Sequence, residues 1–202
     1  MEEIGLFPLG LVLLPTERVP LHIFELRYRE LIGECLETGE EFGLVFTDED
    51  GVRDIGTLAR VDELIEQFDD GRMNIVVEGG GRFSVERLTV GRSFLTAMVA
   101  AVEDDAEEPD AASVGRATAS FRALAAAAEA EGDVEEDGEV PLSFRLAAQV
   151  ELAAERKQEL LELRSERQRL ALVADLLDDV RAALIATREL GERAKKNGSR
   201  LT

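Results

Sequence analysis

The chain has 202 residues and a formal net charge of −20 at pH 7. Hydrophobic residues make up 45% of it, which indicates a globular protein with a sizeable core rather than a disordered chain. A surface this acidic repels phosphate groups, so nucleic acid and anionic membranes are not expected as partners. No stretch approaches the roughly 18 consecutive apolar residues that a membrane span needs.

Two features of the sequence indicate the compartment in which the protein works. Residues 1–3 are Met-Glu-Glu, acidic where a secretory signal is basic. Cys35 is the only cysteine, which excludes an internal disulfide and fits a reducing compartment. We therefore expect a cytoplasmic protein. The scarcity of lysine and the abundance of arginine and alanine suggest a bacterial genome rich in G and C.

The N-terminal segment predicts a strand, a proline-bounded turn and an amphipathic helix. Residues 7–14 are apolar enough for a buried strand, while Pro8 and Pro15 keep that strand from the centre of a regular ladder. Apolar positions then recur at spacings of three and four, which predicts one face of a helix: Phe24, Tyr28, Leu31, Ile32 and Cys35. Gly39 is the expected end of that helix.

About six short strands are predicted after this helix, which favours an antiparallel barrel or sandwich. They are residues 42–46, 55–64, 63–68, 73–78, 82–88 and 94–102. Asp-Asp-Gly-Arg at residues 69–72 lies between two apolar runs, a strong hairpin signal. Residues 79–81 are three glycines. A strand pattern rather than a helix follows them, so a turn or bulge is a better account than a phosphate loop.

The second half of the sequence is helical in pattern. Ser113 is a candidate cap for a helix running to about Ala130. Pro141 suits the first turn of a helix that continues to about Leu163, and residues 165–168 have the form of a capping box. An apolar stripe between Leu170 and Leu184 is broader than a coiled-coil seam, which favours packing within a helical bundle over a dimer zipper.

These composition shifts divide the chain into four parts. We expect a β-rich subdomain (residues 1–104), an acidic linker (residues 105–112), a helical bundle (residues 113–192) and a flexible polar tail (residues 193–202).

No grouping of residues in the sequence indicates catalysis, a metal or a cofactor. His22 is the only histidine and lies among apolar residues, where a structural role with one hydrogen bond is expected. A nucleophile needs a base and an orienting group beside it, and none is evident. Cys35 falls on the apolar helix face and reads as a core residue. One histidine and one cysteine supply too few ligands for a transition-metal site. We therefore expect no catalytic residues, no metal and no cofactor.

The ordered motifs resemble the N-terminal substrate-binding domain of Lon protease. The resemblance rests on the Phe-Pro-Leu segment at 7–9, Pro15, the Leu-His-Ile-Phe-Glu-Leu-Arg-Tyr segment at 21–28, and shorter matches later in the chain. Those later matches are Phe42-Gly43, Ile55-Gly56-Thr57, Asp70-Gly71-Arg72, Gly81-Arg82-Phe83, residues 157–162 and Arg169-Leu170. Family motif residues that we expect to be structural are His22, Phe24, Glu25, Arg27, Tyr28, Gly56, Gly71, Arg82 and Phe83.

The resemblance implies an α+β fold, with a β-rich pseudo-barrel similar to PUA domains followed by a helical bundle. It also implies that Phe24 and Tyr28 anchor the helix and that Glu25 and Arg27 form a local charged pair. Lon proteases carry ATPase and peptidase modules, and neither is found in these 202 residues. We therefore expect a stand-alone recognition domain and not an enzyme.

Three functions follow as hypotheses. The first is a module that binds unfolded or peptide segments of proteins and acts as an adaptor for a protease. The contact residues suggested for it are Leu13, Leu14, Pro15 and Phe46, with core packing as their alternative role. The second is a scaffold that docks a dedicated partner through the helical half. The third is hydrolysis at an unrecognised site that includes His22.

Overall fold

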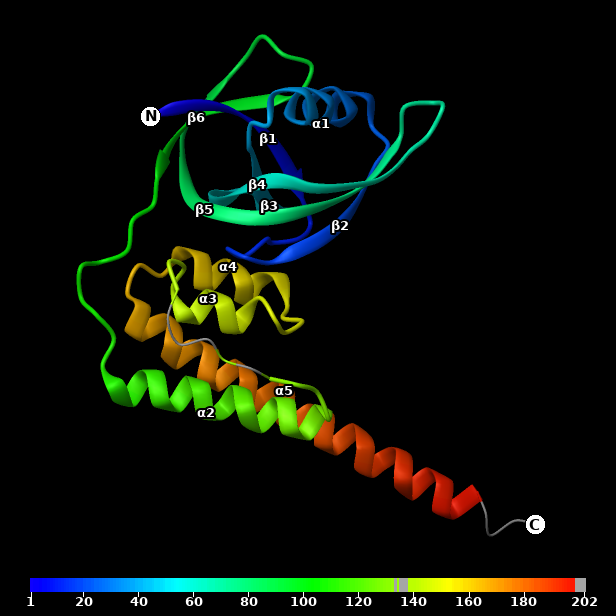
Figure 1. The fold of residues 1–202 in the computed structure, drawn as a ribbon, viewed down its shortest axis with the longest axis vertical. Coiled ribbons are helices and arrows are strands. Elements are labelled where there is room, and N and C mark those ends of the chain that lie inside the picture. Colours follow the sequence, from blue (N-terminus) through cyan, green and yellow to red (C-terminus); the bar gives the residue numbers. More distant parts are fainter. Residues whose placement is uncertain (133, 135–137, 199–202) are drawn as a thin grey trace. The chain divides into compact units, whose positions relative to one another are not determined.

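The structure of the protein is a computed structural model, shown in Figure 1. It describes residues 1–132, 134 and 138–198. Six strands and five helices are formed in this part of the chain, which gives the expected α+β fold. They belong to two compact units: Met1–Ala106 with Ala147–Arg164, and Glu107–Leu146 with Ser165–Thr202. Each unit is described below by itself.

The first unit is a small barrel that carries two helices. Its elements are β1 (Glu2–Leu9), β2 (Arg18–Ile23), α1 (Leu26–Thr38), β3 (Phe42–Asp48), β4 (Gly51–Gln67), β5 (Met73–Thr89), β6 (Leu95–Ala101) and α4 (Ala154–Glu162). The strand order is β2-β5-β4-β3-β1-β6, and β5 also pairs with β6. Five strands therefore close a ring, and β2 is attached to the outer part of β5. Among the strands of the described residues, only β1 and β3 pair in parallel; the other pairs are antiparallel.

Two strands of the barrel are much longer than the sequence pattern predicted. The candidates at 55–64 and 63–68 form one strand, β4, and those at 73–78 and 82–88 form one strand, β5. The three glycines at 79–81 lie inside β5, and the register with β4 shifts opposite them. The interpretation as a bulge is thus the right one, and that as a turn is wrong. The first half of β5 pairs with β2 and the second half with β6. The long strands join β2 to the barrel.

The predicted hairpin and helix are confirmed, with one correction. Gly71 lies in the turn between β4 and β5 with a φ of 83°, and Gly39 ends α1 with a φ of 76°. The buried face of α1 carries Tyr28 and the three apolar positions that follow it. Phe24, however, precedes the helix and is 61% exposed, so it does not anchor it. It follows directly on β2, a strand that the sequence pattern did not predict.

Two apolar clusters fill the first unit. One combines residues from four strands of the closed ring (β1, β3, β5 and β6): Ile4, Leu6, Val45, Phe83, Ala97 and Val99. The other joins the buried face of α1 to β1, β3 and β5 and includes the close stacking of Phe7 on Tyr28, with ring centroids 4.0 Å apart. Since aromatic side chains bury the largest areas, this pair fixes α1 on the sheet.

The second unit consists of helices. It contains α2 (Ala111–Ala128), α5 (Glu166–Gly198) and most of α3 (Leu142–Ala147). Leu170, Val173 and Leu177 of α5 are buried, as the predicted stripe requires. Arg169 is fully buried as well. It donates to Glu166 and to the Ser143 hydroxyl, which satisfies its charge inside the unit.

The boundaries of the units differ from the four parts expected from composition. The helix expected from Pro141 to Leu163 is divided into α3 and α4, and residues 147–164 belong to the unit that holds the barrel. α5 continues to Gly198, into the expected tail. Residues 133 and 135–137 of the expected acidic loop, and residues 199–202, lie outside the described part of the chain. No helix in the described ranges is long and apolar enough to cross a membrane.

Candidate functional site

An apolar groove lies between α1 and the hairpin formed by β4 and β5. We call this hollow the apolar groove; its apolar lining residues are Leu26, Leu36, Leu64 and Met73. The groove has a volume of about 660 Å³. Leu26 is 75% exposed, and Leu36 and Leu64 are exposed as well. Exposed leucines on two adjacent elements form a surface that gains free energy when a partner covers it.

The local sequence explains why these leucines are left uncovered. The buried face of α1 is formed by Tyr28, Leu31, Ile32 and Cys35. Leu26 and Leu36 project from the other side of the helix, together with Arg29, Gly33 and Glu37. The β4–β5 hairpin extends away from the barrel in Figure 1, so its outer part meets this second face of α1 rather than the core. The groove is therefore formed by surfaces that the core does not use.

Three aromatic rings pack against one another near the start of α1: His22, Phe24 and Phe68. We call this group the aromatic ledge. The His22 ring is stacked 6.0 Å from Phe24 and meets Phe68 edge-on at 6.2 Å, between centroids. Its Nδ1 atom lies 2.6 Å from Oδ1 of Asn74. His22 thus makes one hydrogen bond within the described part of the chain, and its exposed ring adds to an aromatic surface. Phe24 connects this ledge to Leu26, two residues further along the chain.

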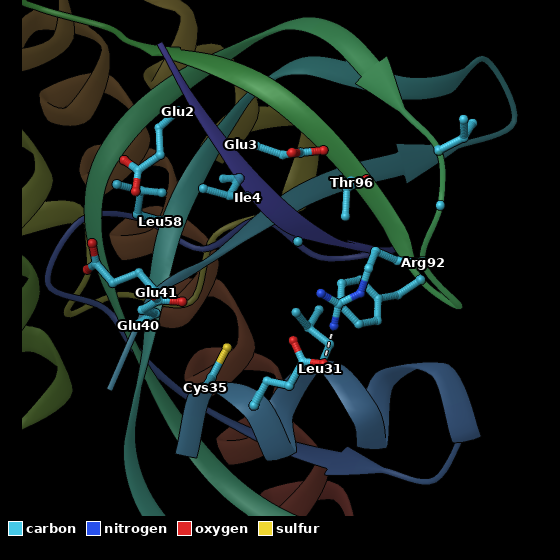
Figure 2. Close-up of a pocket in the computed structure, with 15 residues that line it drawn as sticks. Glu2, Glu3, Ile4, Leu31, Cys35, Glu40, Glu41, Leu58, Arg92 and Thr96 are labelled. Atoms are coloured by element: carbon cyan, nitrogen blue, oxygen red, sulfur yellow. Dashed lines mark hydrogen bonds and ion pairs between the residues drawn. The ribbon is translucent and has the colours of Figure 1, made fainter. Parts of the chain in front are cut away.

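A second hollow, of about 480 Å³, has a different chemical character (Figure 2). It lies between β1, α1 and the loop before β6, and five glutamates line it: Glu2, Glu3, Glu34, Glu40 and Glu41. Arg92 forms an ion pair with Glu34, the dashed line in Figure 2, and its guanidinium lies 4.8 Å from the centre of the Phe94 ring. The acidic lining offers little apolar surface. We therefore regard the apolar groove as the better candidate for binding protein segments.

His22 and Cys35, the one histidine and the one cysteine of the sequence, lie in different surroundings. His22 lines neither hollow, and the hydrogen-bond partner of its ring is the side-chain amide oxygen of Asn74. Burial, with smaller contributions from Glu34 and Glu40, raises the pKa of the Cys35 thiol to about 11. The thiol is therefore protonated at neutral pH and is a poor nucleophile. Among residues that the structure describes, no three histidine, cysteine or acidic side chains gather in a way that could hold a metal ion.

The four residues suggested from the sequence as binding contacts do not line the groove. Leu13, Leu14, Pro15 and Phe46 are all buried. Leu13 packs in the cluster beneath α1. Core packing, the alternative role considered for these residues, is what the structure shows, because their side chains offer no free surface to a partner.

The family motif residues at the start of α1 stabilise local structure. Arg27 forms an ion pair with Glu25 at 2.9 Å, as expected, and its guanidinium lies 4.5 Å from the centre of the Tyr28 ring. Burial raises the pKa of Tyr28, although the Arg27 charge opposes that rise.

Gly56, another family motif residue, lies in β4 where there is no room for a side chain. A Cβ atom at this position would lie 2.6 Å from the carbonyl oxygen of Leu44.

Arg82 and Phe83 connect the barrel to α4. Phe83 fills the barrel interior. Arg82 is buried and donates to the carbonyl oxygens of Leu161 and Leu163 at 2.7 and 2.8 Å, and it forms an ion pair with Asp104. These carbonyls belong to the end of α4, which illustrates how a buried arginine satisfies the exposed acceptors at a helix C-terminus. The motif therefore has a structural role within the first unit.

Sequence reasoning missed the residues that form the groove. The signal was present in α1, where Leu26 and Leu36 fall outside the apolar face defined by Tyr28 and its neighbours. Apolar residues on the polar side of an amphipathic helix are candidates for contact with a partner. Leu64 and Phe68 gave no comparable signal, because they were assigned to an ordinary strand.

Comparisons with known proteins agree with the resemblance noted in the sequence. A curated relative, the Lon protease of Brevibacillus choshinensis, is 27% identical over 217 residues; the match covers 98% of this chain but only 28% of that protein. The crystal structure of a Lon N-terminal domain protein from Xanthomonas campestris matches 85% of this chain and 96% of that one, with a TM-score of 0.65 and 28% identity.

A second solved structure supports the fold alone. The N-terminal domain of Mycobacterium avium complex Lon protease has a TM-score of 0.67 at 18% identity and covers 88% of this chain and 99% of that domain. The family model of the ATP-dependent protease La (Lon) substrate-binding domain matches residues 3–179. With most of its length matched, the chain belongs to the family of Lon substrate-binding domains.

Proposed function

We propose that this protein is a non-enzymatic module that binds exposed apolar segments of other proteins in the apolar groove and on the aromatic ledge. The observation that carries the proposal is the set of exposed leucines and aromatic rings on α1, on the loop before it and on the β4–β5 hairpin. An unfolded segment is the natural occupant, because folded proteins bury the side chains that such a groove accepts. The family model, which describes a substrate-binding domain, supports the same class of partner.

A role as an adaptor that delivers segments to a protease extends this proposal. The curated relative is a Lon protease, and the present chain corresponds to 28% of its length. We infer that captured segments are passed to a protease rather than processed by this module. Affinity capture with the tagged protein, followed by identification of bound proteins, tests this extension. Recovery of client proteins with no protease would count against it.

The scaffold hypothesis receives no support from the helices. It required the stripe from Leu170 onwards to remain exposed. Instead, Leu170, Val173, Leu176 and Leu177 are buried within the second unit, while Leu172, Val180 and Leu184 are half-buried. The buried part of the stripe leads us to favour protein-segment binding over the scaffold role.

Binding of an unfolded model protein tests the proposed function directly. Fluorescence anisotropy with labelled, permanently unfolded casein is expected to show saturable binding. The double variant Leu26→Ser and Leu36→Ser removes apolar surface without altering the core, so affinity should fall by roughly tenfold or more, given about 1.4 kcal/mol per factor of ten. Leu88→Ser is the matched control, because Leu88 is 54% exposed and does not line the groove. Equal effects of both changes would refute the placement of the site.

A further inference from the structure

Gly33 lies at the middle of the groove face of α1 and has no structural requirement for glycine. A Cβ atom there would meet nothing within 4 Å, and Gly33 is not among the residues with positive φ. Glycine in a helix interior costs about 1 kcal/mol relative to alanine. Neither packing nor backbone conformation explains this cost. The missing side chain instead leaves a notch in the wall of the groove.

The two groove residues four positions from Gly33 carry opposite charges. Arg29 precedes it by four positions and lies against Gly71 in the hairpin turn. Glu37 follows it by four positions, is exposed and lines the groove. Glu30 also lines the groove but accepts a hydrogen bond from the Ser93 hydroxyl at 2.6 Å. Within the described ranges Glu37 makes no ion pair or hydrogen bond. The end of the groove beyond the notch therefore carries a carboxylate available to a cation.

The spacing along α1 matches an extended peptide. Residues four apart in a helix are separated by about 6 Å along its axis. In an extended chain, residues two apart point the same way and are separated by about 6.6 Å. A peptide lying along α1 with an apolar side chain in the Gly33 notch would therefore present the residue two positions away to Glu37. A lysine or arginine at that position would complement its charge.

We propose that the groove selects protein segments in which an apolar residue and a basic residue are two positions apart. The apolar side chain occupies the notch at Gly33, between Leu26 and Leu36, and the basic side chain pairs with Glu37. This selectivity rests on the proposed function, since it assumes that the apolar groove binds extended segments. The net charge of −20 adds a longer-range attraction for such cationic segments.

Labelled ten-residue peptides with a glycine–serine background test the selectivity by fluorescence anisotropy. The set contains leucine alone, leucine with lysine two positions after it, leucine with lysine two positions before it, leucine with lysine one position away, and leucine with glutamate two positions away. Exposed ion pairs contribute about 0.2–1 kcal/mol, so one of the two-position lysine peptides should bind about two- to fivefold more tightly than leucine alone. The advantage should shrink in 0.5 M salt. Equal affinity of all lysine peptides would overturn the spacing.

Two variants separate the notch from the carboxylate. Glu37→Gln should remove the preference for lysine over leucine alone, whereas Glu49→Gln, at an exposed residue away from the groove, should keep that preference. Gly33→Leu fills the notch and should weaken all apolar peptides about tenfold, while thermal stability is kept or raised. Gly115→Ala in α2, where a Cβ also meets nothing, controls for the gain in helix propensity.

The outcomes distinguish this inference from the proposed function. Leucine peptides that bind without any effect of lysine or of Glu37→Gln would leave the proposed function standing and overturn the selectivity. Failure of every peptide and of unfolded casein to bind would overturn both. Light scattering on the purified protein tests whether a second copy of the chain occupies the groove. A dimer that is abolished by Leu36→Ser would show that it does and would overturn the proposal.

Discussion

Glu17 and Lys157 lie 140 positions apart in the sequence and form an ion pair inside the first unit, with 10% and 11% of their side chains exposed. The second carboxylate oxygen of Glu17 accepts a hydrogen bond from the backbone N–H of Leu14 at 2.9 Å. Lys157 belongs to the segment 147–164, which the sequence pattern had assigned to the helical bundle. One buried pair thus ties α4 to the loop before β2. Gln158 adds a hydrogen bond to the carbonyl oxygen of Ile55 at 3.2 Å.

Removing one member of this pair should destabilise the protein strongly. Lys157→Met leaves the Glu17 carboxylate buried and unpaired, and breaking a buried pair in this way costs about 3–5 kcal/mol. The free energy of unfolding from urea titration measures the effect. The double change Glu17→Gln with Lys157→Met should recover much of the loss, because no charge is then left uncompensated. A single-variant loss below 1 kcal/mol would show that the pair has no structural role.

Gly79 should tolerate no side chain, in contrast to Gly81 two positions later. A Cβ atom on Gly79 would lie 2.1 Å from the carbonyl oxygen of Leu14. The backbone is held there by two hydrogen bonds: the N–H of Gly79 donates to the carbonyl oxygen of Glu17 at 2.9 Å, and the N–H of Thr16 donates to the carbonyl oxygen of Gly79 at 2.8 Å. Gly79→Ala must therefore push two backbone segments apart, with a loss of about 1–3 kcal/mol or more. Gly81→Ala meets only a leucine methyl at 4.0 Å and serves as the control. Thermal unfolding of both variants measures the difference in stability. Equal melting temperatures would contradict the close approach of Gly79 to Leu14.

The pH dependence of stability should report on Cys35. Burial raises the pKa of this thiol from 9.0 to about 11. Because the folded pKa is the higher one, the associated stability is fully present below pH 9 and is lost as the pH rises towards 11. The free energy of unfolding should therefore fall more steeply over this range in the native protein than in Cys35→Ala.

Thiol labelling gives an independent check. At pH 8 a thiol reagent should modify the native protein far more slowly than the urea-unfolded chain, because Cys35 is both protonated and buried. Rapid labelling of the folded protein would show that the thiol is accessible and would contradict this account.

Asp110, and not Ser113, should be the capping residue of α2. The Asp110 carboxylate accepts a hydrogen bond from the backbone N–H of Ser113 at 2.7 Å, and this bond is the main cause of its lowered pKa. Asp110→Ala should therefore destabilise the protein, whereas Asp110→Asn, which also caps helices well, should have a smaller effect. Ser113→Ala, the cap predicted from sequence, should matter less.

The pH dependence of this cap follows from the direction of its pKa shift. A carboxyl group whose folded pKa is lowered contributes stability above its ordinary pKa of 3.8 and loses it as the pH falls through the folded value. The stability difference between the native protein and Asp110→Asn should accordingly shrink in acid. A difference that stays constant from pH 7 to pH 2.5 would contradict the role of the charge.

Local chemistry made several elements predictable from the sequence. The turn at Gly71, the end of α1 at Gly39 and the buried positions from Tyr28 onwards depend on residues within a few positions of each other. The same is true of the start of α5 after Ser165, whose hydroxyl accepts from the N–H of Gln168 at 3.4 Å. Spacing rules and capping preferences act over this range, so they could be applied without a fold.

The long strands and the groove residues could not be predicted in this way. The run of glycines at 79–81 has the composition of a turn, and only the approach of Leu14 to Gly79 shows why it remains inside β5. The exposure of Leu26 and Leu64 depends on where α1 and the β4–β5 hairpin meet, which no local pattern records. The four contact residues proposed from sequence, among them Phe46, were apolar enough to bind a partner but were needed for the core.

The sequence by itself therefore determined the family, the α+β class and the absence of a recognisable catalytic motif. Tertiary structure decided which apolar residues are covered and which remain exposed, because burial depends on the packing of segments far apart in the chain. It also decided that α4 joins the barrel, since a buried partner for Lys157 exists only where Glu17 is brought to it. The apolar groove was decided in the same way, by the meeting of α1 with a hairpin that begins thirteen residues after α1 ends.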